Sequence, residues 1–266
     1  MYKSQTIAYS IFTAVIFIFF NCKNKETPVL SADTIITKAI EVSGGAKIDS
    51  SLINFDFRDK HYMAYRNKGV FHFERKFRDT TSRYFDTINT ITDILNNKGF
   101  MRLADNFPIS VTDTMVTKYS ASINSVHYFS VLPYGLNDKA VNKELLSDVS
   151  IKGKDYYTIK VTFDQEGGGE DFEDVFLYWV NRETFKVDYL AYSYNEEDGK
   201  GLRFREAYNQ RIIEGIRFVD YNNYKPESAS VELIDLAQLF QDDALKLLSK
   251  IELENVTVNS ALVPDL

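Results

Sequence analysis

LRFREAYNQRIIEGIRFVDYNNY, residues 202–224, has the pattern of a β-hairpin. Apolar and polar residues alternate on both sides of Glu214-Gly215, which is typical of two strands joined by a two-residue turn. Such a turn sets three cross-strand pairs: Arg211 with Phe218, Asn209 with Asp220, and Ala207 with Asn222. The stretch therefore predicts two long antiparallel neighbours in one sheet.

The period-two pattern continues along most of the chain. Further strands are predicted over residues 156–163, 172–180 and 185–194, and an earlier group between residues 51 and 103. In that earlier group, two Asn-Lys-Gly segments stand between alternating runs and are hairpin signals. Consecutive hairpins predict a large antiparallel sheet.

Three segments have helical rather than strand periodicity. Ser31 can cap a first helix that stops near Gly44, and Asp113 can cap a second one that ends before Pro133. A short third helix is expected over residues 236–247. So few helices cannot cover both faces of a large sheet. The predicted fold class is mainly β with a few helices, α+β: one large curved antiparallel sheet, a half-open barrel, with the helices packed on its concave side.

The N-terminus has the pattern of an export signal that ends in a cysteine. Lys3 is followed by a mostly apolar run over residues 7–20 and then by Cys22, the single cysteine of the chain. The run is shorter than the roughly 20 apolar residues that span a bilayer as a helix, and a short uncut anchor is the alternative. In this respect the chain resembles bacterial lipoprotein precursors, which implies that Cys22 carries lipid.

The lipoprotein resemblance also implies how the chain is divided and where it resides. Residues 1–21 are expected to be the signal peptide, residues 22–30 a lipidated tether, and residues 31–266 a single half-barrel domain. Lys23, rather than an aspartate, follows the cysteine, which favours the outer membrane. The periplasmic face is preferred, and surface display remains the alternative.

Charge and cysteine content exclude several classes of function. The chain has 31 Lys and Arg against 38 Asp and Glu, a formal net charge of −7, which argues against nucleic acid as the main partner. With one cysteine, disulfides, cysteine metal sites and thiol catalysis are not expected.

The strongest candidate site is an arginine-rich face of the predicted hairpin. Strand alternation places six residues on it, namely Arg203, Arg205, Asn209, Arg211, Asp220 and Tyr224. Guanidinium forks bind carboxylates and phosphates and stack on aromatic rings, so this face is expected to bind an anionic or sugar-like ligand. The alternative is an internal network in which the arginines pair with Asp174, Asp188 or Asp220.

Other chemistry is weakly supported by the sequence. It contains no nucleophile elbow, phosphate loop or paired-histidine zinc motif, and no cofactor or metal is expected. His61 and His72 could face each other across a hairpin, but two histidines make a poor metal site. Six carboxylates surround a glycine run and could hold calcium or form a solvated hairpin tip: Asp164, Glu166, Glu170, Asp171, Glu173 and Asp174.

Two resemblances bear on fold and function. The order helix, meander, helix, meander resembles the LolA-like half-barrels of lipoprotein carriers. Six segments resemble uncharacterised, mostly flavobacterial, Bacteroidota envelope lipoproteins: YTIKVTF at 157–163, GGG at 167–169, YW at 178–179, DYLAY at 188–192, RFREA at 203–207 and DYNNY at 220–224. No activity comes with the second family.

Three functions compete on this basis. The first is a non-enzymatic lipoprotein that binds or carries an amphiphilic or anionic ligand, such as a lipid, a lipoprotein or a glycan component. The second is a periplasmic or surface enzyme acting on glycan or lipid, with Asp174, Glu206 or Asp220 as acid or base. The third is a structural partner subunit of the envelope.

Overall fold

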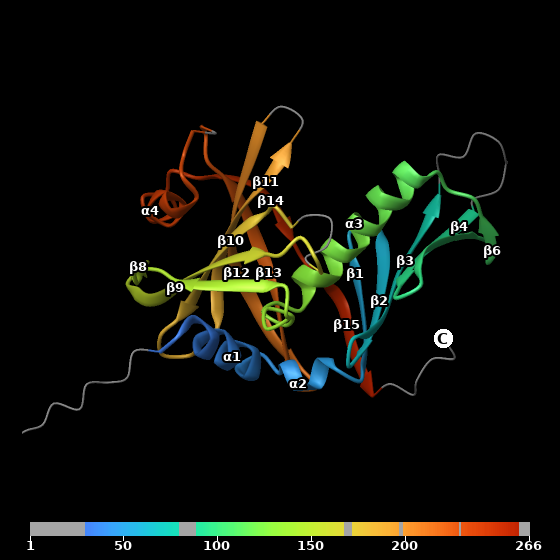
Figure 1. Cartoon of the computed structure of the whole chain (residues 1–266), viewed down its shortest axis with the longest axis horizontal. Helices are drawn as coiled ribbons and strands as arrows, with labels where there is room; N and C mark the ends of the chain where they lie inside the picture. Colours follow the sequence, from blue (N-terminus) through green and yellow to red (C-terminus); the bar gives the residue numbers. More distant parts are fainter. Residues whose placement is uncertain (1–29, 80–88, 168–171, 197–198, 229, 261–266) are drawn as a thin grey trace, which may run out of the picture.

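The computed structural model of the chain describes residues 30–79, 89–167, 172–196, 199–228 and 230–260. Strands dominate these residues and form two antiparallel sheets, which lie side by side and do not close into a barrel (Figure 1). The predicted leader and Cys22 lie outside the described residues.

Each sheet is built mostly from consecutive hairpins. The first sheet runs in the order β15 (Glu254–Ser260), β1 (Ser51–Phe57), β2 (Lys60–Asn67), β3 (Val70–Asp79), β4 (Asn89–Asn96), β5 (Gly99–Ala104) and β6 (Phe107–Ile109). The second runs in the order β14 (Lys246–Ile251), β13 (Ile216–Lys225), β12 (Gly199–Ile213), β11 (Val187–Glu196), β10 (Val175–Asn181), β9 (Lys154–Phe163) and β7 (Val141–Leu145), with β8 (Val149–Ile151) also paired to β9. The chain therefore returns to the first sheet only with its last strand.

Four α-helices and a 3-10 turn accompany the sheets in the described chain. They are α1 (Ala32–Val42), α2 (Gly45–Ile48), α3 (Asp113–Ser130), the turn η1 (Leu233–Asp235) and α4 (Leu236–Gln241). Ser31 caps α1 as predicted, because its hydroxyl accepts from the Thr34 amide at 3.2 Å. Among the described helices, none combines the length and the apolar composition that a membrane crossing requires.

The second sheet is covered by helices on both faces. On one face, Tyr178 and its neighbours pack against Ile35, Ile36 and Ala39 of α1. On the other, Trp179 packs with Leu236 and Phe240 of α4. Tyr178 and Trp179 are both completely buried, so both belong to the core.

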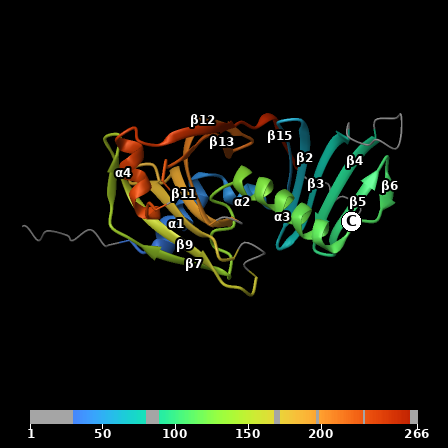
Figure 2. The same cartoon turned by 90° about the horizontal axis from the view of Figure 1, so that it is seen from above.

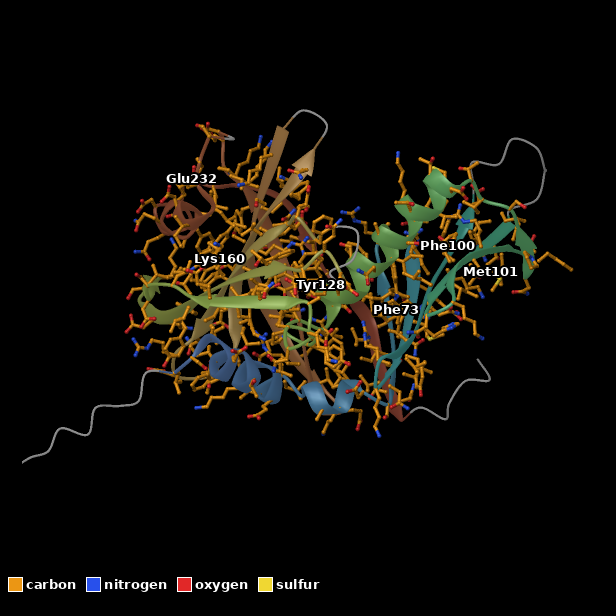
Figure 3. The ribbon with its side chains drawn as sticks, viewed as in Figure 1. Phe73, Phe100, Met101, Tyr128, Lys160 and Glu232 are labelled. Atoms are coloured by element: carbon orange, nitrogen blue, oxygen red, sulfur yellow. The ribbon has the colours of Figure 1, made fainter. Side chains whose placement is uncertain are left out.

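Helix α3 lies in the space between the two sheets (Figures 1 and 2). On the side of the first sheet it contacts Phe73 and Phe100, and toward the second sheet it extends Tyr128 (Figure 3). The Tyr128 hydroxyl is 2.8 Å from that of Tyr178. The Arg75 guanidinium also donates to the Ser122 hydroxyl at 2.8 Å, so α3 is attached to both sheets.

The predicted fold class is confirmed: the molecule is mainly β, antiparallel and open, with a few helices. Three details differ. The strands divide between two sheets rather than one, and α4 covers the face opposite to α1. The third helix ends at Gln241 instead of near residue 247, because residues 246–251 pair with β13 as an edge strand.

Candidate functional site

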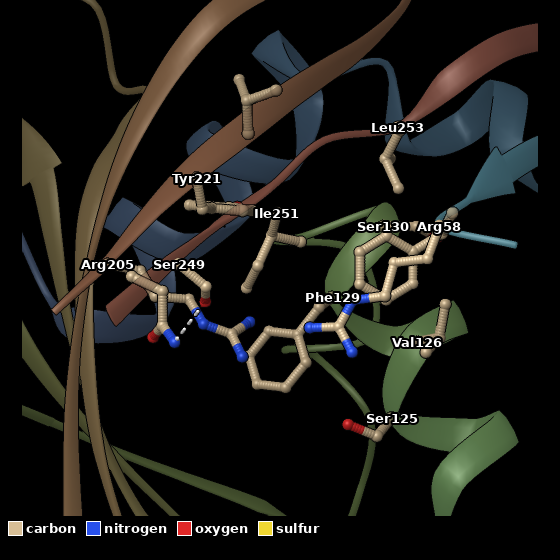
Figure 4. A pocket seen from close by; sticks show the side chains of 13 residues that line it. Arg58, Ser125, Val126, Phe129, Ser130, Arg205, Tyr221, Ser249, Ile251 and Leu253 are labelled. Carbon is tan, nitrogen blue, oxygen red and sulfur yellow. Dashed lines mark hydrogen bonds between the residues drawn. The ribbon is translucent and has the colours of Figure 1, made fainter. Parts of the chain in front are cut away.

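Three cavities adjoin the C-terminal half of α3. The central cavity, of about 230 Å³, lies between α3 and strands β12 to β14 (Figure 4). The aromatic cavity, of about 540 Å³, shares Ser125 and Phe129 of α3 with it. A third cavity, of about 570 Å³, lies on the first-sheet side and shares Asn124, Tyr128 and Phe163 with the aromatic cavity.

The central and aromatic cavities are lined mainly by apolar and aromatic side chains. The central cavity is lined by Phe57, Arg58, Ser125, Val126, Phe129, Ser130, Arg205, Val219, Tyr221, Asn223, Ser249, Ile251 and Leu253. The aromatic cavity is lined by Asn124, Ser125, Tyr128, Phe129, Phe163, Glu173, Asp174, Phe176, Tyr192, Tyr194 and Asn195. A few polar groups in a mostly apolar concavity are typical of small-molecule sites.

Strand alternation places the side chain of Arg205 in the wall of the central cavity. Its neighbour Phe204 points to the opposite face and packs against Phe240 of α4. Arg205 pairs across the hairpin with Asn223 of β13, and both side chains therefore face the cavity.

Arg205 is a buried cation in aromatic surroundings. It is 8% exposed, its guanidinium carbon lies 3.8 Å from the centre of the Phe129 ring, and its Nη2 donates to the Tyr192 hydroxyl at 2.8 Å. Its Nε is fully buried and finds no hydrogen-bond partner within the described residues. Arg205 also forms no ion pair with any described carboxylate. Because Arg205 lines the central cavity, the part of its guanidinium that reaches the cavity is available to a ligand.

Two further polar groups face the same space as Arg205. The Asn223 amide donates from Nδ2 to the Ser249 hydroxyl at 3.2 Å, while its Oδ1 is buried and has no partner among the described residues. Arg58, an exposed residue of the β1–β2 turn, reaches the cavity from the opposite wall (Figure 4). Of the described residues that line the central cavity, two are cationic and none is acidic.

The opposite face of β12 carries a closed polar network. Arg211 Nη2 lies 2.9 Å from Asp220 Oδ1 and also donates to the Leu253 carbonyl. Asp220, which is 2% exposed, accepts further hydrogen bonds from Asn209 Nδ2 at 2.6 Å and from the Leu253 amide at 3.0 Å. The carboxylate is saturated by these donors, so this network holds β12, β13 and the segment after β14 together.

Tyr224 belongs to that same face. Its hydroxyl donates to Glu206 Oε2 at 3.1 Å, and its ring lies 5.4 Å from Phe240. Burial, followed by the Glu206 charge, raises the pKa of Tyr224 to about 12. Tyr224 therefore stabilises the contact with α4 and lies away from the central cavity.

Arg203 lies on the Arg205 face, outside the central cavity. Its guanidinium carbon is 5.1 Å from the centre of the Tyr194 ring, and its Nη1 donates to the Leu202 carbonyl at 2.9 Å. Because Tyr194 lines the aromatic cavity, Arg203 lies near the rim of that cavity.

The predicted single arginine face is therefore wrong, and a β-bulge is the reason. The turn at Glu214-Gly215 and the pairing of Arg211 with Phe218 are confirmed. Beyond them Asn209 adopts a left-handed conformation, with φ of 46°, and the register shifts by one residue. Asp220 consequently pairs with Tyr208 instead of Asn209, and Asn222 pairs with Glu206 instead of Ala207. Arg203 and Arg205 are thereby separated from Arg211, Asp220 and Tyr224.

Several residues of the site were not identified from the sequence. Phe129 and Ser125 come from α3, whose position against the second sheet no local pattern indicates. Tyr221 and Asn223 could have been found by applying alternation to β13 with the bulge included. Arg58 follows β1 in a turn and carries no signal of its own.

A second buried arginine, Arg66, lines the third cavity and was also missed. Its Nη2 donates to the His127 carbonyl at 3.0 Å, and its guanidinium carbon lies 4.6 Å from the centre of the Phe73 ring. Burial lowers the pKa of Arg66 to about 10. Burial likewise lowers the pKa of His127 well below its usual value, so this histidine is a neutral core residue.

The other sequence candidates are dispersed. His61 pairs with Lys76 and His72 with Tyr65, so the two histidines do not face each other. Among the described residues, no three His, Cys, Asp or Glu side chains gather as a metal site; Glu170 and Asp171 of the acidic loop lie outside these residues. Asp174 lines the aromatic cavity, whereas Glu206 and Asp220 belong to the opposite face of the sheet.

Three solved structures are similar to this chain. A LolA superfamily protein from Nitrosomonas europaea is 14% identical, with a TM-score of 0.47 over 89% of this chain and 96% of that one. A DUF1329 family protein from Desulfovibrio piger is 11% identical, with a TM-score of 0.40 over 88% and 95%. An outer membrane lipoprotein-sorting protein domain from Vibrio parahaemolyticus is 8% identical, with a TM-score of 0.35 over 77% and 99%.

Sequence comparison gives a family. Among the curated proteins, none matches this sequence. The model of a family of unknown function, DUF6503, matches residues 11–253 and so covers most of the chain. The chain is therefore a member of family DUF6503.

Proposed function

We propose that this protein is a lipid-anchored lipoprotein of a Bacteroidota envelope that binds or carries an amphiphilic or anionic ligand and catalyses no reaction on it. The ligand is a lipid, a lipoprotein or a glycan component. The anchor is an acylated Cys22, and the location is the outer membrane, with the domain on its periplasmic face.

One observation carries the binding role: adjoining cavities lie between α3 and the second sheet. The central and aromatic cavities share the side chains of Ser125 and Phe129, and aromatic rings form much of their walls. Sites for small molecules commonly measure about 300–1,000 Å³ and are mostly apolar with a few polar groups. The aromatic cavity falls in this range, and the central cavity adds a smaller polar compartment.

The distribution of carboxylates favours binding over catalysis. An acid–base pair acting on glycan requires two carboxyl groups on either side of one bond. Asp174 and Glu206 lie on opposite faces of the second sheet, and Asp220 is saturated by Arg211, Asn209 and a backbone amide. The three candidate carboxylates do not form such a pair.

Native mass spectrometry of the chain from residue 22 onward, carrying Cys22→Ser, tests the binding role, because this form lacks both the apolar leader and the expected acylation and needs no detergent. The expected result is a co-purified amphiphile. Ser125→Trp, which fills the junction of the two cavities, should abolish it. Lys118→Trp, on an exposed position of α3, should retain it. A bare mass for the Cys22→Ser chain that also fails to bind a hydrophobic fluorescent probe would contradict the proposal.

A further inference from the structure

Arg205 differs from Arg75 and Arg102 in how its charge is balanced, whereas Arg66, also buried without an ion pair in the described chain, donates to a backbone carbonyl. In the first sheet, Arg75 and Arg102 share the fully buried Asp93, at 2.6 Å and 2.5 Å. Arg205 has a ring face and one tyrosine hydroxyl in place of a carboxylate. Aromatic rings and a neutral acceptor balance a buried cation only partly, since a buried charge without an ion-pair partner is costly. An anion in the cavity would supply the missing charge.

The neighbouring polar groups suit the same anion. The Ser249 hydroxyl can donate or accept, so the Asn223 amide can turn either its oxygen or its NH₂ group into the cavity. With the NH₂ group inward, Asn223 adds a donor next to the guanidinium of Arg205, its cross-strand partner, since both residues line the cavity. Two convergent donors match the two oxygens of a carboxylate or phosphate. Arg58 adds a second positive charge at the opposite wall.

Charge also distinguishes the two ends of the site. The central cavity is lined by two arginines and no acidic residue among the described ones, whereas Glu173 and Asp174 line the aromatic cavity. An anionic head is therefore attracted to the central cavity and repelled by the far part of the aromatic one. The aromatic cavity is the larger of the two, and the six aromatic rings in its wall can pack against an acyl chain.

We propose that the ligand is a single-chain anionic amphiphile whose carboxylate or phosphate head binds to Arg205 inside the central cavity while its chain occupies the aromatic cavity. This inference rests on the proposed binding function and adds the class and the orientation of the ligand. Asn223 orients the head, and Arg58 attracts it from the opposite wall. Phe129 separates the two compartments and contacts both head and chain.

Titration calorimetry with three probes of equal chain length tests this: dodecanoate, dodecyl phosphate and dodecanol. The Cys22→Ser chain without the leader should bind at least one of the two anions about tenfold to a hundredfold more tightly than the alcohol, as expected for a charge-assisted hydrogen bond. The anion that binds more tightly identifies the head as carboxylate or phosphate.

Substitution of Arg205 then isolates its charge. Arg205→Met should remove the preference for the anion and leave dodecanol binding within about twofold. The matched control is Arg78→Met, an exposed arginine of the first sheet that lines none of the three cavities. It changes the net charge equally and should alter no affinity. Arg58→Met, at an exposed position, should weaken only the anions, and it serves as the second variant if Arg205→Met folds poorly.

The outcomes separate the two proposals. If dodecanol binds the Cys22→Ser chain as tightly as both anions, or if Arg205→Met keeps the preference, the inference about the head is wrong and the amphiphile-binding function stands. If none of the three probes binds the Cys22→Ser chain, the inference is wrong, and the binding function is contradicted with it when native mass spectrometry also finds no co-purified amphiphile.

Discussion

Strand β12 carries an arginine on each of its two faces, and the two positive charges are balanced in different ways. Arg211 is fixed by Asp220, which also accepts from Asn209 and the Leu253 amide. Arg205, six residues earlier, lies against Phe129 and Tyr192 at the wall of a cavity and has no carboxylate partner in the described chain. One strand thus provides a structural ion pair on one face and a ligand-binding cation on the other.

The difference originates in a single extra residue. Without the bulge at Asn209, alternation would bring Arg203, Arg205 and Arg211 to one face, where three positive charges would compete for Asp220. The bulge rotates the strand so that, of the three arginines, only Arg211 pairs with Asp220. A local backbone irregularity therefore sets which arginine is left for a ligand.

The largest expected effect comes from breaking the closed network. Asp220→Ala leaves Arg211 and the Leu253 amide without their acceptor inside the protein. We expect a loss of about 3–5 kcal/mol in the free energy of unfolding, measured by urea denaturation. Glu144→Ala, which removes an exposed carboxylate paired with Lys160, should change it by less than about 0.5 kcal/mol. Equal effects of the two substitutions would show that the network is not structural.

The bulge itself can be tested at Asn209. Asn209→Val places a β-branched residue at φ of 46°, whereas Asn209→Gly adopts this conformation freely. Both variants lose the hydrogen bond to Asp220, so their difference isolates the backbone strain. Urea denaturation should show the valine variant to be less stable by about 1–2 kcal/mol. A valine variant as stable as the glycine variant would contradict the left-handed conformation.

Arg205 should matter much less for stability than Asp220. In ligand-free protein, Arg205→Met removes a ring contact and one hydrogen bond but also removes an uncompensated buried charge. These effects oppose each other, so the free energy of unfolding should change by no more than about 1 kcal/mol. A loss as large as that of Asp220→Ala would assign Arg205 a structural role and contradict the comparison.

The smallest effect concerns alkaline pH. Burial raises the pKa of Tyr221, on the cavity face, above its usual value of 10. The unfolded chain therefore releases this proton first, and the stability that Tyr221 contributes is complete below pH 10 and lost as the pH rises further. Tyr221→Phe should flatten the decline in urea midpoint above pH 10 and leave its pH dependence near pH 8 unchanged. An unaltered decline would indicate that the phenol is solvated.

Much of the fold could be predicted because its signals are local. The hairpin at Glu214-Gly215 follows from two alternating runs around a Glu-Gly turn, and α1 follows Ser31, a good helix cap. The predicted pairing is correct from the turn as far as Arg211 and Phe218. These features depend on a few neighbouring residues and little on the rest of the molecule.

The candidate site was only partly predictable because it depends on distant contacts. Asparagine tolerates the left-handed conformation, so a bulge at Asn209 was possible. Many asparagines in strands do not form bulges, however, and the sequence alone does not distinguish the two cases. Alternation alone identified Arg205 as a site residue, but it placed Arg205 on the same face as Arg211 and Asp220, which is wrong. The partners Phe129 and Ser249 come from α3 and β14, and their approach is fixed by packing that no local pattern records.

The central claim is that Arg205, and not Arg211, receives an anionic ligand. A crystal structure of the protein with dodecanoate or dodecyl phosphate, whichever binds more tightly, tests it most directly. The account predicts a head-group oxygen about 2.7–2.9 Å from an Arg205 nitrogen, with the chain packed against the rings of Phe129 and Phe176. A head group on the Arg211–Asp220 pair, or one left in solvent with only the chain inside, would contradict it.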